Sequence, residues 1–398
     1  MDKTCNLDNG EFRAIYRADA SYYILGVAGI IIASVGLLLN SFGLFVVWKI
    51  KENHILQKLI VCLLSFDTTL LFFSIIDFSF RGLKCRNTMF VYGIPYVVYP
   101  GFYMSLFCSI YMTVCISHER YSALQDPIRY SQIMNIEGYQ DRKIMKYVSL
   151  VILGSVLYNI FRFFEHTVNC VTTSDYEELI LKDEVMIAQY SEWKDAFNCT
   201  QPYVNIVVQM NDETIFGKEE DEGTFRTIIA VADSVVLGIV PALLLISFNS
   251  KIHCCIQCQR KYIRGSNQPL LEKDGVEIRK REIKIRKNEV RMALSFIAIV
   301  VAFLSCYSIK LLYSLISAWS YKEFYDNSKS WYILMEYIGL LLIVVNSTIN
   351  ILLYGLFGKK FRKEVYDLMT DLFSCKNKCY FSNSPTEEID LEYKSDKQ

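Results

Sequence analysis

Seven stretches of this sequence are long and apolar enough to cross a membrane, and this pattern constrains the fold more than any other feature. A helix that spans the hydrocarbon core needs about 20 predominantly apolar residues. Hydrophobic residues make up 52% of the 398-residue chain, and they are gathered into blocks rather than spread at the period of a soluble domain. The predicted spans are Tyr22–Trp48, Leu56–Phe80, Phe90–Ile116, Tyr147–Phe164, Phe225–Phe248, Val290–Ser317 and Trp331–Phe357.

The sequence therefore predicts an all-α membrane protein, a seven-transmembrane helix bundle. A segment with apolar residues at helical spacing and a basic face follows the last span, which indicates a short amphipathic eighth helix on the membrane surface. The predicted parts are an extracellular N-terminal tail (1–21), the bundle (22–357), the amphipathic helix (358–371) and a disordered cytoplasmic tail (372–398).

The charges of the loops predict the orientation of the bundle. Residues 251–287 carry eleven Lys or Arg against four acids, whereas residues 167–224 carry thirteen acids against three lysines. Basic loops face the cytoplasm, so these are the third intracellular and the second extracellular loop. We expect a multi-pass protein of the plasma membrane with its N-terminus outside.

This topology sorts the cysteines and the modification sites. Four cysteines lie on the outer side, where disulfides persist: Cys5, Cys85, Cys170 and Cys199. Asn198 begins an Asn-Cys-Thr glycosylation sequon outside the membrane. Cys375 and Cys379 follow the amphipathic helix and are candidates for palmitoylation.

Charged residues within membrane-length helices are costly and usually functional. Asp67 lies in the middle of the second span, where it either bonds to a neighbouring helix or forms an ion or proton site. At the end of the third span stands Glu119-Arg120-Tyr121, followed by Pro127-Ile128. The simplest alternative for Arg120 is that it reaches towards the lipid headgroups.

The Glu-Arg-Tyr sequence followed by Pro-Ile resembles the motif that ends the third span of the rhodopsin-like (class A) G-protein-coupled receptors. Further positions are similar to that family's pattern: Asn40, Asp67, Pro241, Asn350, Tyr354 and Phe361. The resemblance covers Tyr22 to Met369. It implies a receptor rather than an enzyme, with a heterotrimeric G protein and arrestin as partners and no catalytic residue.

The resemblance assigns roles at the inner end and in the middle of the bundle. Residues implied in G-protein coupling are Glu119, Arg120, Tyr121, Ile128 and Glu289, with an Arg120–Glu289 pair as the lock between spans 3 and 6. The alternative for Glu289 is a solvated rim charge. A hydrated sodium pocket and its surroundings would comprise Asn40, Asp67, Ser109, Asn346, Ser347, Asn350 and Tyr354. An allosteric Na⁺ is thus the one cofactor implied, and no metal site is otherwise expected.

The sequence departs from the family at the activation switch and at the outer cysteines. The switch would comprise Pro241, Phe303, Cys306 and Tyr307, but Ile309 and Ile351 replace prolines of the family, and the tryptophan of span 4 is absent. Without its proline, the kink in span 6 lacks its usual cause. The usual disulfide is displaced, so the expected bridge is Cys85 with Cys170 or Cys199, and the sequence does not choose between them.

Within the family, Tyr158–Glu165 and the region from Val344 to Arg362 are most similar to invertebrate FMRFamide-type neuropeptide receptors. This resemblance implies an amidated, cationic Arg-Phe-type peptide, which the acidic outer loop would attract. The candidate ligand contacts are Asp77, Tyr96, Phe102, Tyr103, Asp233, Lys310, Glu336 and Tyr337. The alternative is that the acids are solvated or pair with Arg162 or Lys310.

Two rival functions remain open at this level. One is an orphan or chemosensory class A receptor for another class of ligand. The other is a seven-helix transporter in which Asp67 relays ions or protons, although no inverted repeat supports it. Enzyme chemistry is disfavoured because His54, His118, His166 and His253 have neither metal-site nor triad spacing.

Overall fold

A computed structural model of the chain describes residues 19–50, 55–83, 93–164, 166–172, 186–188, 204–210, 222–265, 273–319, 330–357 and 361–370. All seven predicted spans contain a described helix, and helices of the second half extend well beyond the predictions. The helical elements are η1 (Ser21–Gly29), α2 (Ile30–Lys49), α3 (Ile55–Arg81), η2 (Ile94–Val98), α5 (Tyr99–Gln125), α6 (Pro127–Met134), α7 (Tyr139–Asn159), η3 (Ile160–Phe163), α9 (Glu222–Asp233), η4 (Ser234–Ile239), α10 (Val240–Gly265), α11 (Lys273–Trp319) and α13 (Ser330–Phe357).

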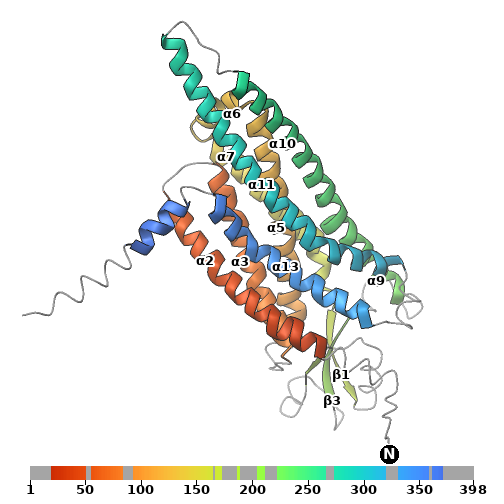
Figure 1. Cartoon of the computed structure of the whole chain (residues 1–398). Helices are drawn as coiled ribbons and strands as arrows, with labels where there is room; N and C mark the ends of the chain where they lie inside the picture. Colours follow the sequence, from red (N-terminus) through yellow and green to blue (C-terminus); the bar gives the residue numbers. More distant parts are fainter. Residues whose placement is uncertain are drawn as a thin grey trace, which may run out of the picture.

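The membrane-length helices lie side by side in one elongated bundle (Figure 1). Among the described residues, six helices are long and apolar enough to cross a membrane, and the sixth predicted span is represented by the shorter apolar segment Val300–Ile316 of α11. In the apolar stretch of Ile94–Gln125, 72% of the residues are buried, against 22% in Tyr139–Phe163. The third span is therefore the central helix, and the fourth lies at the periphery.

Wide π-helical turns occupy the outer parts of spans 1, 3 and 5 as η1, η2 and η4. The segment η4 ends just before Pro241, which has no N–H to continue the α-helical ladder. The segment η2 contains Pro95 and is followed by Pro100. By contrast, α11 runs without interruption through Ile309, as expected for a span that lacks its kinking proline.

The inner ends of α10 and α11 project beyond the rest of the bundle (Figure 1). Most of the predicted third intracellular loop is helical, because α10 continues to Gly265 and α11 begins at Lys273. A helix also occupies 361–370, within the predicted amphipathic segment. Its Glu364 forms an ion pair with Lys49 at 3.5 Å, which ties this helix to the end of α2.

The predicted second extracellular loop contains three strands, β1 (His166–Thr172), β2 (Met186–Ala188) and β3 (Val204–Met210), in the order β1-β3-β2. The pairing is antiparallel, with Val168 opposite Val208. These strands lie at the end of the bundle opposite to the projecting helices (Figure 1). The helical bundle matches the predicted fold class, and the small sheet is an addition that we had not predicted.

Candidate functional site

The Glu119-Arg120 pair lies in the last turns of α5, on the central helix of the bundle. Helix α5 ends at Gln125, and α6 begins at Pro127 with the Asp126 side chain accepting a hydrogen bond from the backbone N–H of Arg129 at 3.2 Å. Neither charged side chain is solvated, since Glu119 is 0% and Arg120 is 1% exposed. The alternative that Arg120 reaches towards the headgroups therefore does not describe this structure.

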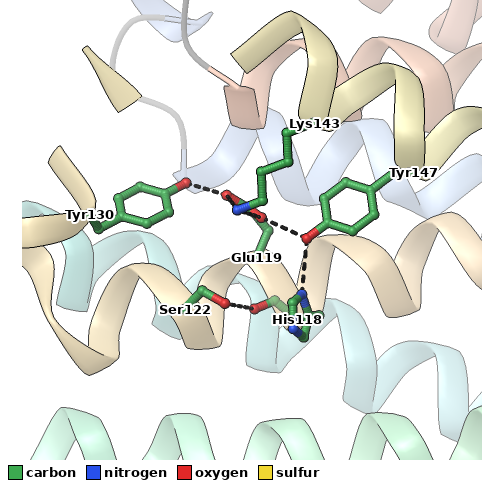
Figure 2. Close-up of polar contacts among 6 residues, drawn as sticks. All are labelled: His118, Glu119, Ser122, Tyr130, Lys143 and Tyr147. Atoms are coloured by element: carbon green, nitrogen blue, oxygen red, sulfur yellow. Dashed lines mark hydrogen bonds and ion pairs between the residues drawn. The ribbon is translucent and has the colours of Figure 1, made fainter. Parts of the chain in front are cut away.

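Glu119 is held by three residues from α6 and α7 (Figure 2). The hydroxyl of Tyr130 donates to Oε1 at 2.5 Å, and the hydroxyl of Tyr147 donates to Oε2 at 3.0 Å. The Lys143 ammonium lies 3.0 Å from Oε1 and 2.8 Å from Oε2. A buried carboxylate is tolerated only when it is paired and hydrogen-bonded, and this arrangement meets both conditions.

The network extends from Tyr147 to His118, whose Nδ1 lies 3.0 Å from the tyrosine oxygen (Figure 2). The single hydroxyl proton of Tyr147 is donated to Glu119, because a carboxylate only accepts. His118 must then be the donor to Tyr147, which places a proton on its Nδ1. The sequence predicted Glu119 but not its partners.

Tyr121 and Ile128, which were also predicted for coupling, lie on α5 and α6. Tyr121 is half-buried and lies beside Phe248 of α10, with ring centroids 6.4 Å apart. Ile128 is half-buried at the start of α6. The side chain of Glu289 lies outside the described residues, so the Arg120–Glu289 pair stays a prediction.

Asp67 is fully buried and links three helices in the middle of the bundle. Ser109 of α5 donates to its Oδ1 at 2.6 Å, and Asn350 of α13 donates to its Oδ2 at 2.8 Å. Asn40 of α2 donates to the backbone carbonyl of Ser347 at 3.0 Å. The structure thus brings together residues from four spans that the sequence predicted as one pocket.

The remaining predicted members of this pocket belong to α13. Asn346 and Ser347 are buried on α13. The side chain of Tyr354 lies outside the described residues. Carboxylate and hydroxyl oxygens are the ligands that hard cations prefer, so the Asp67 and Ser109 oxygens fit the implied sodium ion.

The predicted switch residues pack between spans 5 and 6. Phe303 and Tyr307 stack with ring centroids 5.2 Å apart, and both are buried in the main core. Cys306 is half-buried, and Pro241 is buried near the start of α10. Tyr307 thus fills a core position on the uninterrupted α11.

Towards the outer end, Asp77 forms an ion pair with Arg81, one turn further along α3, at 2.9 Å. Arg81 also donates to the Tyr99 hydroxyl at 2.6 Å and lies 3.9 Å from Glu336 of α13. Two of the three predicted acidic ligand contacts therefore already face a cation of the protein. Arg81 was not among the predicted site residues.

The third predicted acid, Asp233, pairs with Arg162 from η3. Tyr158 donates to the same carboxylate oxygen at 2.7 Å. The guanidinium carbon of Arg162 lies 3.9 Å from the centre of the Tyr103 ring, and this arginine is 1% exposed. Pairing of an acid with Arg162, which we had left open, is the arrangement that the structure has.

The other predicted ligand contacts are dispersed. Lys310 lies with its ammonium 5.0 Å from the centre of the Tyr313 ring and within electrostatic range of Glu336 and Asp233. Phe102 and Tyr337 are buried in the core. Tyr96 is 43% exposed, so it is the least enclosed of the predicted aromatic contacts.

Several predicted sites fall outside what the structure describes. These are the side chain of Cys170, which lies in β1, and the residues Cys85, Asn198, Cys199, Cys375 and Cys379. The disulfide, glycosylation and palmitoylation sites therefore stay predictions.

Sequence reasoning missed the partners of the buried acids, although weak signals existed. Lys143 and Tyr147 are four residues apart, so they lie on one face of α7. Arg81 follows Asp77 at the same spacing on α3. No comparable signal links Arg162 to Asp233, which are 71 residues apart.

Comparison with known families agrees with the geometry. A family model described as 7 transmembrane receptor (rhodopsin family) matches residues 40–354, which include Asn40, Asp67, Arg120 and Tyr354. A search of curated proteins found no match. Because the family match covers well over half of the chain, and the buried polar residues of that pattern meet in the bundle, this multi-pass membrane protein belongs to the rhodopsin family of seven-transmembrane receptors.

Proposed function

We propose that the protein is a plasma-membrane receptor that passes the binding of an extracellular peptide to a heterotrimeric G protein. The observation that carries the proposal is the buried Arg120 at the inner end of the central helix, beside a Glu119 whose charge is already balanced by Lys143. Separation of the surrounding helices would expose this arginine to a new partner. Family membership supports the same reading.

The mechanism is a population shift between a closed and an open bundle. Peptide binding at the outer end favours an arrangement in which the inner half of α11 moves outward and Arg120 contacts the G protein. Ile128 of α6 inserts into the same partner, and the basic inner ends of α10 and α11 face the anionic leaflet. Arrestin then binds the C-terminal tail after phosphorylation.

The decisive experiment compares Arg120→Ala with Arg142→Ala in a G-protein activation assay. Arg142 is exposed on α7 and serves as the matched control. We expect Arg120→Ala to abolish activation at equal surface expression, while Arg142→Ala retains it. A ligand-driven current or flux that survives in Arg120→Ala would instead favour the transporter.

For the ligand we propose an amidated Arg-Phe-type peptide whose guanidinium takes the place of Arg81 or Arg162 at Asp77 or Asp233. The support is the resemblance of Tyr158–Glu165 and of the region from Val344 to Arg362 to FMRFamide-type receptors, together with the small side-chain exposure of the two acids, 5% for Asp77 and 15% for Asp233. Amidated peptides should activate the receptor, and Asp77→Asn with Asp233→Asn should lower their potency at least tenfold, since a lost charge-assisted contact is worth about 1.5–3 kcal/mol. Unchanged potency would contradict the assignment.

We further propose that Na⁺ binds beside Asp67 and favours the closed bundle. Replacing Na⁺ by choline at constant ionic strength should then lower the thermal stability of the purified receptor. Asp67→Asn should remove this difference, and a difference that persists in the variant would contradict the site.

A further inference from the structure

Helix α10 carries a buried polar residue, Gln259, on the face that packs against the inner ends of α5 and α11. Ile252, Ile256 and Gln259 are spaced by four and three residues, so they share one side of the helix. The two isoleucines pack with Leu124 of α5 and Val290 of α11 in a small core at the inner end. Gln259 is only 7% exposed at the edge of this core.

Both ends of the Gln259 amide are used, and each contacts a different helix. Its Nε2 donates to the backbone carbonyl of Leu124 at 3.1 Å, and its Oε1 accepts from Nη1 of Arg286 at 2.5 Å. Leu124 belongs to the last turn of α5, and Arg286 to the inner extension of α11. One side chain thus joins the inner ends of spans 3, 5 and 6.

The contact to Leu124 has a physical reason. The last four carbonyls of a helix lack an intrahelical partner, and α5 ends one residue after Leu124. Gln259 supplies that partner from a neighbouring helix. An amide is suited to this position because it donates and accepts at the same time. A carboxylate or an ammonium would lose one of the two contacts, and an apolar side chain would lose both.

We propose that Leu124, Gln259 and Arg286 form an inner clasp that holds α11 against α5 and α10 in the resting bundle. Gln259 is its positioning residue. The clasp joins α5, the helix that carries Arg120, to α10 and α11, and none of its members belongs to the Arg120–Glu289 pair. The inference rests on the proposed movement of α11, because outward movement must separate Arg286 from Gln259.

The clasp makes resting receptor activity depend on a neutral amide. When α11 moves outward, the Arg286 contact is lost and the Gln259 amide keeps only the α5 carbonyl. Replacing Gln259 by a residue without an amide should therefore favour the open state in the absence of ligand. A coupling of this kind typically shifts an equilibrium by roughly 5- to 150-fold.

The test uses the full-length receptor without ligand and two readouts. Spin labels at Glu137, between α6 and α7, and at Lys284 of α11 report the separation of the inner ends, after the exposed Cys254 and Cys258 are replaced by serine. Basal G-protein activation is measured in parallel. The variants are Gln259→Met, which preserves volume, Arg286→Met, their combination, and Gln257→Met as control, because exposed Gln257 bonds only to His253 of its own helix.

We expect Gln259→Met and Arg286→Met each to populate longer distances and raise basal activation about tenfold. The combination should have less effect than the sum of the two single changes, since both remove the same Gln259–Arg286 hydrogen bond. Arg286→Lys keeps a hydrogen-bond donor and should retain most of the short distances between the two labels. Comparison of Arg286→Lys with Arg286→Met therefore tests the clasp even if Gln259→Met folds poorly.

The proposal is overturned if Gln259→Met and Arg286→Met give the distance distribution of Gln257→Met, whatever the basal activity does. It is equally overturned if the two changes add in full. Longer distances without any G-protein activation would support the clasp and contradict the proposed coupling, so the two hypotheses fail separately.

Discussion

At the inner end of the bundle, Glu119 receives contacts from Tyr130, Lys143 and Tyr147, which are 11, 24 and 28 residues away in the chain. At the outer end, Asp233 is paired with Arg162 across 71 residues. The inner cation remains partly hydrated, since the Lys143 side chain is 21% exposed, whereas that of Arg162 is 1% exposed. Both ends neutralise an acid within the bundle, with the side chain of Glu119 0% and that of Asp233 15% exposed. They differ in the distance along the chain and in whether water reaches the cation or the acid of the pair.

This difference implies different roles for the two ends of the bundle. A partly hydrated inner network can rearrange at modest cost when a cytoplasmic partner binds, because water replaces lost contacts. An enclosed outer pair cannot be opened without a replacement of similar charge. The outer end should therefore contribute more to stability, and a ligand acting there must supply its own charged group.

The largest expected effect is at the outer pair. Arg162→Met removes the cation that pairs with the Asp233 carboxylate, whose side chain is 15% exposed, and leaves Tyr158 donating to its Oδ1. Breaking a buried pair costs about 3–5 kcal/mol. We expect a marked drop in the thermal stability of the purified receptor.

The matched control for this prediction is Arg162→Met combined with Asp233→Leu. Removing both charges of a buried pair is often close to neutral, so the double variant should regain most of the lost stability. If the single variant is as stable as the unmodified protein, the outer pair is not the enclosed element that the comparison requires.

Close helix contacts offer a second comparison of the two ends. At the outer end, a Cβ added to Gly82 would lie 2.3 Å from the backbone nitrogen of Gly26; at the inner end, one added to Gly43 would lie 2.2 Å from Cδ1 of Ile351. A backbone atom cannot turn away, whereas the end of an isoleucine can. Gly82→Ala should therefore lower stability more than Gly43→Ala, and overpacking typically costs about 1–3 kcal/mol.

Thermal unfolding of both variants would measure this order, with Gly93→Ala as a control because nothing lies within 4 Å of its added Cβ. Adding Ile351→Ala to Gly43→Ala should restore part of the lost stability, because it removes the side-chain atom that the new Cβ would contact. An equal loss for Gly82→Ala and Gly43→Ala would contradict the idea that the outer helices are held more rigidly.

The sequence predicted features that depend on one helix at a time. The seven spans follow from runs of apolar residues, and the polar positions Asn40, Asp67 and Asn350 stand out against those runs without any knowledge of packing. Their meeting in one cluster came from the family resemblance, and the hydrogen bonds of Asp67 agree with it.

Features that depend on two distant segments were not predicted. Arg162 was recognised only as an alternative partner of the acids, and Gln259 was not recognised at all, because pairing across helices leaves no periodic trace in one sequence. Arg81 was missed although it follows Asp77 by four residues on the same helix. The extension of α10 and α11 was missed for another reason. Their ends away from the predicted spans are rich in charged residues, so hydropathy falls while the helix continues.

The smallest expected effects lie at the inner rim, where two lysines can be changed to methionine in parallel. Lys143→Met leaves Glu119 buried with two tyrosine donors, so a loss of about 1–3 kcal/mol is expected from the missing charged hydrogen bonds. Lys58→Met removes the pair with Asp141, whose side chain is 70% exposed, and exposed pairs contribute about 0–1 kcal/mol.

The dependence of stability on ionic strength should distinguish the two lysine variants further. Raising the ionic strength screens exposed charges but hardly affects buried ones, so the small loss in Lys58→Met should vanish at high salt while that in Lys143→Met persists. Thermal unfolding at low and high salt measures both. If the two variants respond alike, Glu119 is as hydrated as Asp141, and the graded access to water that distinguishes the inner end from the outer end would have to be abandoned.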